Sequence, residues 1–165
     1  MNKLSFRSAT RADVPLLKHW DEQPHVIASD PEQWDWESDF EWNDPAVRKF
    51  IAELDGRPIG FVQIIEPQLE QSHYWGEIGS GYMAIDIWIG EAYDLNKGYG
   101  TKMMKIAIDK CFSDPAVHTI LIDPLKSNVD AHRFYKRIGF EFVEERDFND
   151  EECFVFQLKR SNFLK

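Results

Sequence analysis

Short runs of alternating apolar and polar residues occur at both ends of the chain and near its middle. Alternation with a period of two is typical of β-strands buried on one face. The runs predict strands at residues 4–8, 48–53, 58–65, 118–122, 140–144 and 153–158. Residues 55–58, Asp-Gly-Arg-Pro, have the chemistry of a tight turn, so we expect the second and third strands to form a hairpin.

Apolar residues spaced three and four positions apart predict helices elsewhere. One helix follows Thr10 and runs to about Trp20, a second spans residues 99–112, and a third spans residues 129–138. Asn128 is a favourable N-cap for the third helix, and Gly139 is a typical residue to end it. Strands interspersed with helices predict a mixed α/β fold with one central sheet, in a single domain over residues 1–165.

The central strand of that sheet is predicted at residues 84–90, Ala-Ile-Asp-Ile-Trp-Ile-Gly. Its three isoleucines share one face, whereas Asp86 and Trp88 lie on the other. A buried carboxylate is costly unless it is paired. Asp86 is therefore either a hydrogen-bonded structural residue, or a base or amine anchor in a cleft.

A glycine-containing turn, residues 94–101, separates this strand from the helix at 99–112. Glycine lets the backbone approach a ligand closely, and the first N–H groups of a helix attract anions. Gly98-x-Gly100 is thus a candidate phosphate site, although many strand-to-helix turns contain glycine for geometry alone. The order strand, turn, helix, strand, helix over residues 84–138 predicts a parallel crossover unit.

Residues 30–44, the acidic tryptophan segment, combine seven acids with Trp34, Trp36 and Trp42, and contain no Lys or Arg. One interpretation is a surface helix whose tryptophans pack on the core and whose acids are solvated. The other is an acidic, aromatic wall for a polycationic ligand, since carboxylates bind ammonium groups and indoles bind sugar faces or cations. For the acids, both the surface helix and the ligand-binding wall remain open. For at least one tryptophan we favour the ligand-binding wall.

Composition and net charge reduce the number of ligand classes that the protein is expected to bind. The formal net charge of −10 argues against nucleic acid as a partner and is compatible with a cationic small molecule. No apolar run is long enough to cross a membrane, residues 1–6 lack the apolar core of a secretion signal, and the two cysteines have no metal-binding spacing. We therefore expect a cytoplasmic protein that uses no metal.

The chain resembles the GCN5-related N-acetyltransferases (GNAT). Gly98-Tyr99-Gly100 match the acetyl-CoA signature of that superfamily, and residues 128–140, Asn-x-x-Ala-x-x-Phe-Tyr-x-x-x-Gly-Phe, match the motif after its fifth strand. Within it, the chain is similar to the aminoglycoside 6′-N-acetyltransferases at residues 85–86, 95–102, 112–117 and 122–128, and in the hairpin at 56–63. Leu95 replaces the usual Gln or Arg of the signature, a departure that this subfamily shares.

This resemblance implies a mostly antiparallel sheet with a splayed parallel pair of strands, and direct transfer of acetyl from acetyl-CoA to a primary amine in a ternary complex. It implies that Asp86 acts as base or positions the amine, and that Tyr135 lies near the thioester sulfur as acid or anchor; the alternative for Tyr135 is a core tyrosine. Coenzyme A contacts are expected at Ile87, Trp88, Ile89, Leu95, Asn96, Lys97, Gly98, Tyr99, Gly100, Thr101, Asn128 and Tyr135. Acceptor contacts are expected at Asp86, Asp123, Gln63, Trp75, Glu77, Trp34 and Trp36.

Two other functions remain open at this point. Trp20 and residues 24–26, Pro-His-Val, are similar to siderophore-type lysine acyltransferases, although those usually have His where this chain has Asp86. An acceptor that is a siderophore precursor or a protein amine is therefore the alternative to an aminoglycoside. A module that binds acyl-CoA without catalysis is the third possibility. Monomer and homodimer are both compatible with the sequence.

Overall fold

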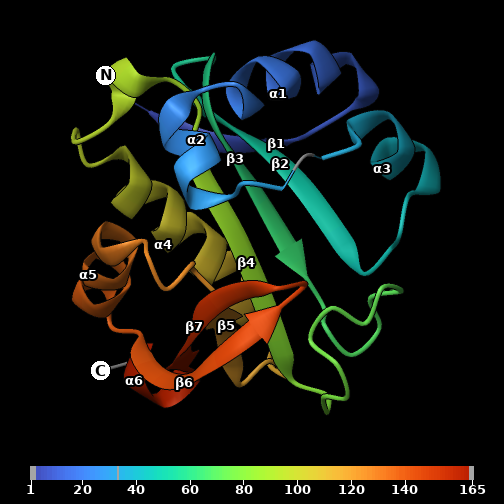
Figure 1. The fold of residues 1–165 in the computed structure, drawn as a ribbon, viewed down its shortest axis with the longest axis vertical. Coiled ribbons are helices and arrows are strands. Elements are labelled where there is room, and N and C mark those ends of the chain that lie inside the picture. Colours follow the sequence, from blue (N-terminus) through green and yellow to red (C-terminus); the bar gives the residue numbers. More distant parts are fainter. Residues whose placement is uncertain (1–2, 33, 164–165) are drawn as a thin grey trace.

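A seven-stranded sheet runs through the computed structural model, which describes residues 3–32 and 34–163 (Figure 1). Its order is β1-β2-β3-β4-β5-β7-β6, and only the β4–β5 pair is parallel. The strands are β1 (Leu4–Ser8), β2 (Val47–Leu54), β3 (Arg57–Ile65), β4 (Tyr82–Ile89), β5 (Thr119–Ile122), β6 (Glu141–Phe148) and β7 (Glu151–Lys159). The predicted mixed α/β class, mostly antiparallel with one parallel pair, is confirmed.

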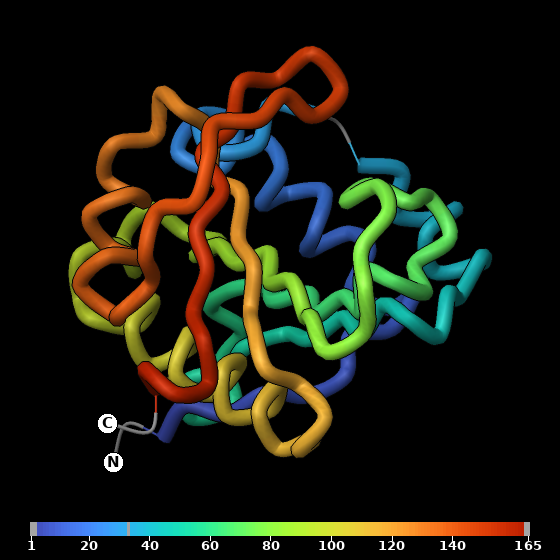
Figure 2. The backbone as a smooth tube through the Cα atoms, turned by 90° about the horizontal axis from the view of Figure 1, so that it is seen from below, coloured from blue at the N-terminus to red at the C-terminus, as the bar shows by residue number. Residues whose placement is uncertain are grey.

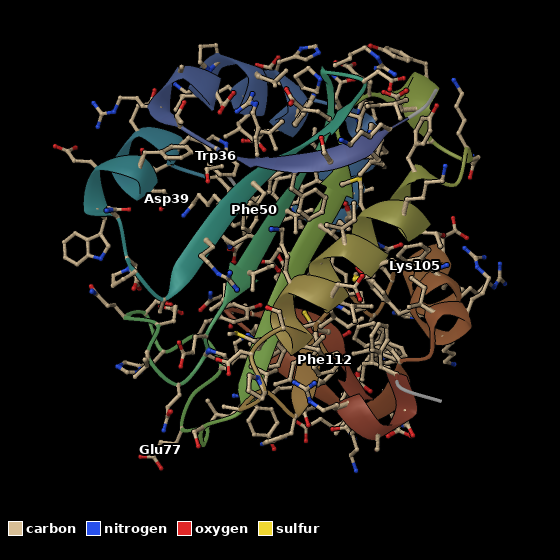
Figure 3. All side chains as sticks on the ribbon, turned by 180° about the vertical axis from the view of Figure 1, so that it is seen from behind. Trp36, Asp39, Phe50, Glu77, Lys105 and Phe112 are labelled. Atoms are coloured by element: carbon tan, nitrogen blue, oxygen red, sulfur yellow. The ribbon has the colours of Figure 1, made fainter. Side chains whose placement is uncertain are left out.

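Helices cover both faces of the sheet (Figures 1 and 3). They are η1 (Arg11–Asp13), α1 (Val14–Asp21), α2 (Pro24–Ser29), α3 (Trp36–Trp42), η2 (Ala92–Asp94), α4 (Tyr99–Phe112), α5 (Val129–Ile138) and α6 (Arg160–Phe163). Helix α4 packs on one face in a core with alternate strand residues such as Phe50 and Val62. Helices α1 and α3 pack on the other face, where Ile51 and Phe61 point. The alternation along β2 and β3 therefore divides the interior into two layers.

The parallel pair of strands is short. Its register joins Tyr82 to Thr119 and Ala84 to Leu121, whereas β4 continues to Ile89. Within the described residues, β4 beyond Ala84 has no strand partner on its β5 side. An unpaired stretch of strand inside a sheet leaves backbone N–H and C=O groups free for another partner.

The predicted helices at 99–112 and 129–138 are present, and Asn128 caps the latter by accepting a hydrogen bond from the Ala131 amide at 3.2 Å. The closing hairpin is longer than expected, because β6 continues to Phe148 and only Asn149 and Asp150 form the turn. Both turn residues have positive φ, 48° and 68°. Such a two-residue turn matches the twist of the strands and allows pairing up to its edge.

Residues 66–81 form an irregular loop without helix or strand. Figure 2 shows this loop beside the acidic tryptophan segment, although the two are distant in sequence. Asp44 accepts a hydrogen bond from the Gln71 amide at 3.0 Å, and the Trp42 indole N–H donates to the Gln71 side chain at 2.7 Å. In the described part of the chain, no helix is both long and apolar enough to span a bilayer.

Candidate active site

A cavity of about 1300 Å³ opens where β4 and β5 diverge. Its walls come from the end of β4, the loop before α4, the start of α5, the acidic tryptophan segment and the loop at residues 66–81. These five segments lie far apart in sequence, and the sheet brings them together. The cavity is large enough for two extended small molecules to meet inside it.

A row of polar side chains crosses the floor of this cavity. The strand register places Lys49 of β2 opposite Gln63 of β3, and Gln63 opposite Asp86 of β4. Directly paired residues share a face of a sheet, so all three point to the same side. Asp123 follows Leu121 by two residues, as Asp86 follows its partner Ala84, so Asp123 continues the row beyond the short β5.

The carboxylate of Asp86 is set among apolar strands and is held by one hydrogen bond. The Gln63 side-chain amide donates to it at 3.0 Å. Burial raises the pKa of Asp86 to about 6; the Gln63 bond opposes this rise, and the charge of Asp30 adds to it. A carboxylate with such a pKa is ionised at neutral pH yet accepts a proton more readily than an exposed aspartate.

Asp123 forms the second carboxylate of the row. The hydroxyl of Tyr74 donates a hydrogen bond to it, and the Tyr74 ring stacks on Phe148 with centroids 4.5 Å apart. Burial and the charge of Asp86 raise the pKa of Asp123 to about 8. Two carboxylates in one cavity disfavour each other's ionisation. A cationic ligand between them removes that repulsion, so the pair is suited to binding an amine.

Tyr135 projects from α5 into the same cavity. Its ring packs edge-on against Phe140, with centroids 5.8 Å apart, which fixes its direction. Burial, followed by the charges of Asp86 and Asp123, raises the pKa of the Tyr135 hydroxyl. The hydroxyl therefore keeps its proton at neutral pH and is available as a donor.

The loop before α4 presents unpaired amides to the cavity. Asn96 and Gly98 both have positive φ, 60° and 81°. In the described residues, the N–H groups from Asn96 to Thr101 make no hydrogen bond. A Cβ on Gly98 would meet nothing within 4 Å, so this glycine is needed for its backbone conformation and opens onto free space. Successive free amides at a helix N-terminus form an anion site.

This loop is anchored by an ion pair between a buried carboxylate and an exposed guanidinium. The Arg57 guanidinium donates two hydrogen bonds of 2.9 Å to Asp94, whose side chain is 1% exposed. Bidentate pairing holds both partners in one geometry. Asp94, two residues before the first free amide, is thereby attached to the β2–β3 hairpin.

The free edge of β4 lines the groove between this loop and the carboxylates. The Gly90 amide donates to the Ile59 carbonyl at 2.9 Å, so Gly90 faces β3. By alternation, the backbone groups of Ile87 and Ile89 face away from β3, toward the gap. A ring nitrogen of His25 lies 2.8 Å from the Ile89 carbonyl, so that acceptor already has a donor.

The acidic tryptophan segment is divided between core and cavity. Trp36 is fully buried, donates its indole N–H to Asp21 at 2.6 Å and packs edge-on against Phe61. Trp34 stacks on Trp36 with centroids 4.8 Å apart and lines the cavity. Five of the seven acids also line it: Asp30, Glu32, Asp35, Asp39 and Asp44. Trp36 therefore packs on the core as the first interpretation expects, and Trp34 and these five acids lie where the second interpretation places a ligand, whose binding stays a prediction.

Comparisons with known proteins agree with this geometry. The model of a family described as "Acetyltransferase (GNAT) domain" matches residues 9–148. The chain belongs to the GNAT acetyltransferase family. It is 30% identical over 154 residues to the aminoglycoside N(6')-acetyltransferase type 1 of Klebsiella pneumoniae, covering 85% of this chain and 75% of the relative.

Other relatives of this GNAT acetyltransferase include a spermine/spermidine N(1)-acetyltransferase of Bacillus subtilis (strain 168). It is 30% identical over 105 residues, which cover 63% of this chain and 66% of the relative. Among solved structures, the aminoglycoside acetyltransferase AAC(6')-Ib in complex with coenzyme A and kanamycin superposes with a TM-score of 0.88. That match has 27% identity and covers 98% of each chain.

The structure of the GNAT acetyltransferase brings most of the predicted site residues to one cavity. Those that line it are Asp86, Tyr135, Ile87, Trp88, Ile89, Leu95, Asn96, Gly98, Tyr99, Gly100, Thr101, Asn128, Asp123, Gln63, Trp75 and Trp34. Three predicted residues do not line it. Lys97 and Glu77 are exposed, with Glu77 at the periphery in Figure 3, and Trp36 lies in the core.

The cavity residues that were absent from the predicted site include His25, Asp30, Lys49 and Tyr74. Asp30 accepts the Trp34 indole N–H at 2.8 Å, and burial raises its pKa. The sequence places Asp30 in a segment with six other acids, and nothing in the sequence distinguishes it from them. Lys49 and Tyr74 depend on cross-strand register and on loop packing, for which a single sequence has no local signal.

Proposed function

We propose that this GNAT acetyltransferase transfers an acetyl group from acetyl-CoA to a primary amine of a cationic small molecule, the 6′-amine of an aminoglycoside. The observation that supports this most is a juxtaposition. The amide-rich loop and the free edge of β4 meet the carboxylates of Asp86 and Asp123 in one cavity. Acyl transfer requires donor and acceptor sites to open onto each other in this way.

The residues present fit coenzyme A. The free amides from Asn96 to Thr101 suit a diphosphate, because they lie at the N-terminus of α4 and include two left-handed residues. The backbone groups of Ile87 and the Ile89 N–H, which face the gap beside β4, suit the amides of an extended pantetheine chain, whereas the Ile89 carbonyl is occupied by His25. Asn128 lines the cavity and uses its side-chain oxygen as the N-cap of α5, which leaves its amide N–H groups to donate. Acetyl-CoA supplies an activated acyl thioester at this site.

The carboxylates supply the acceptor chemistry. An ammonium group has no lone pair with which to attack, so a proton must leave the amine. Asp86 is ionised at neutral pH and takes that proton, while the Gln63 amide holds the carboxylate in place. A bond forms between the amine nitrogen and the acyl carbon, and the carbon–sulfur bond breaks. The protonated Tyr135 hydroxyl donates to the departing sulfur.

The outer part of the cavity favours a multiply charged amine. The acidic tryptophan segment contributes five carboxylates to the wall, together with the Trp34 indole. Carboxylates concentrated in a cleft raise the local concentration of cations and guide them inward. Relatives named for aminoglycoside acetylation support this acceptor class.

The direct test is release of free thiol from acetyl-CoA in the presence of kanamycin. We expect turnover by the wild type, with Asp86→Asn lowering kcat by about 10²–10⁴-fold because the base is lost. Tyr135→Phe should also lower kcat, and both variants should bind coenzyme A nearly as the wild type does. Asp109→Asn, an exposed residue of α4, is the matched control and should leave kcat unchanged.

Two outcomes would replace this proposal. Turnover of a lysine-derived amine or a peptide N-terminus, with none for any aminoglycoside, would indicate an N-acyltransferase for a siderophore precursor or a protein. If Asp86→Asn and Tyr135→Phe both matched the wild type, the assignment of these residues would be wrong. Coenzyme A binding without turnover of any amine would indicate a binding module.

A further inference from the structure

Lys49 is a cation among the acids that line the acceptor side of the cavity. It lies on β2, is partly buried and lines the cavity wall. Within the described residues its ammonium forms no direct ion pair; its recorded side-chain contact is with the Phe40 ring, 5.9 Å from the centroid. Lysine rarely occupies a buried position without a close partner. This side chain is therefore available to a ligand.

The sheet directs Lys49 toward the acceptor. Phe50, the next residue, packs in the core against α4, on the face seen in Figure 3. Alternation places Lys49 on the opposite face, in the row with Gln63 and Asp86. Two strand spacings separate Lys49 from Asp86, about 10 Å between backbones. A ligand of the size of a sugar ring bridges that distance.

The charges around Lys49 reduce its repulsion of cations without removing it. Asp39 of α3, Asp44 before β2 and Asp86 of β4 all act on its ammonium from a distance. Burial is the larger effect and lowers the pKa of Lys49, which shows that these acids do not fully compensate the loss of water. A hydroxyl or ether oxygen of a ligand compensates that loss directly, whereas a second ammonium increases the cost.

We infer that Lys49 is a specificity residue that selects an amino sugar over a linear polyamine, by donating a hydrogen bond to a ligand oxygen about two strand spacings from the reacting amine. This inference rests on the proposed function and deepens it. A linear polyamine places further ammonium groups along the same row, where Lys49 repels them. An amino sugar places hydroxyl groups there, and these accept hydrogen bonds from the lysine.

A purely structural role for Lys49 makes a different prediction. If Lys49 only balanced the charges of Asp39 and Asp44, its removal would lower stability and reduce activity on every acceptor equally. Specificity is a difference between two affinities, so a specificity residue changes the ratio of two substrates. The ratio is thus the quantity to measure.

The experiment compares kanamycin with spermidine as acceptors for the wild type, Lys49→Met, Lys49→Arg and Lys105→Met. Lys105 is an exposed lysine of α4 and serves as the matched control (Figure 3). We expect the wild type to prefer kanamycin in kcat/KM. Lys49→Met should shift the ratio toward spermidine by about tenfold, the size of one charge repulsion at this distance. Lys49→Arg and Lys105→Met should keep the wild-type ratio.

Binding of the same two amines to each variant, measured by calorimetry with coenzyme A present, separates the two hypotheses. If the wild type turned over neither amine but Lys49→Met bound the two amines in a shifted ratio, the proposed function would be refuted and the inference supported. Turnover by the wild type with an unchanged ratio in Lys49→Met would refute the inference alone. Binding of neither amine would overturn both.

Discussion

At the scale of single residues, the site depends on carboxylates placed where water is scarce. Asp86 lies on β4 and Asp123 directly follows the neighbouring strand β5. Burial raises the pKa of both carboxyl groups. Each has one neutral donor, Gln63 for Asp86 and Tyr74 for Asp123. Neutral donors hold a carboxylate without neutralising it. The negative charge of Asp86, which is ionised at neutral pH, is left for a cationic ligand, and binding of that ligand favours ionisation of Asp123, whose pKa is about 8 without it.

The pKa of Asp86 predicts the pH dependence of catalysis. A base works only when it is ionised, so kcat/KM, which reports the free enzyme, should rise with pH through about 6 and then level off. The measurement is kcat/KM for kanamycin between pH 5 and pH 8.5. Asp86→Asn should lose this rise together with most of the rate. If the residual activity of Asp86→Asn still rose with pH at the same midpoint as the wild type, the titrating group would be one other than Asp86.

At the scale of elements, the sheet and its loops determine the shape of the cavity. Strand β4 extends beyond its pairing with β5, and this mismatch creates the groove. Gly90, just after β4, lets the Trp20 ring approach, since a Cβ there would come within 2.0 Å of it. The end of β4 is thereby packed against α1. The glycine-containing turn before α4 begins a few residues later, at Asp94, whose buried carboxylate pairs with the exposed Arg57.

That ion pair predicts an effect on coenzyme A affinity. Arg57→Leu leaves the Asp94 carboxylate buried and unpaired, directly before the amides that would hold a diphosphate. Because the Arg57 side chain is 46% exposed, solvent screens this pair, and the cost is less than the roughly 3–5 kcal/mol of breaking a fully buried one. We expect Arg57→Leu to lower the thermal midpoint and to weaken coenzyme A binding by about tenfold or more through repulsion of the diphosphate.

Calorimetric titration with coenzyme A measures the affinity of this variant, and Arg48→Leu, an exposed arginine of β2, is its control. The double variant Arg57→Leu/Asp94→Asn should regain most of the lost affinity, because the unpaired charge is removed. An affinity that falls equally in the single and double variants would show that the guanidinium itself, rather than its shielding of Asp94, matters for binding.

At the scale of the whole molecule, the site is a source of instability. Acids from several helices, strands and loops face one cavity in a chain with a net charge of −10. Burial raises the pKa of Asp30 and Asp39 as well as those of Asp86 and Asp123. Grouped charge of one sign opposes the compact state and favours a cationic ligand. Ligand binding should therefore stabilise the fold as well as position the amine.

These pKa values predict a decline in stability as pH rises. A carboxyl group whose pKa is higher in the folded state binds its proton more tightly there, and this stabilises the fold. Its contribution to the free energy of unfolding is complete below about pH 4, the unfolded pKa, and is lost as the pH rises through the folded pKa. With values of about 6 and 8, the loss should extend from about pH 4 to pH 8. Asp13 has the opposite shift, because Arg7 lowers its pKa, so its contribution is lost only below about pH 4.

The measurement is the free energy of unfolding by denaturant at several pH values. Asp123→Asn should flatten the curve between pH 6 and pH 8 while keeping the Tyr74 hydrogen bond, and Asp109→Asn should leave it unchanged. A wild-type stability that increases from pH 6 to pH 8 would contradict the raised pKa of Asp123.

Much of the fold and part of the site could be predicted because they depend on interactions between residues that are close in the sequence. The side-chain period placed Asp86 on a face opposite three isoleucines, and β4 has that arrangement. The N-cap chemistry of Asn128 and the conformational freedom of Gly98 depend on adjacent residues, and both were correctly placed. The closing turn was misjudged because Asn149 and Asp150 alone complete it, which requires knowing the strand register.

The sequence by itself determined the strands, the capped helices, the glycine turn and the presence of a carboxylate in the central strand, because each depends on neighbours within a few positions. Only the tertiary structure decided which acids meet, that Trp36 belongs to the core and Trp34 to the cavity, and that Tyr74 holds Asp123. It also placed Lys49 in line with Asp86. These relations follow from cross-strand register and loop packing, which join residues far apart in the chain and leave no periodic signal in it.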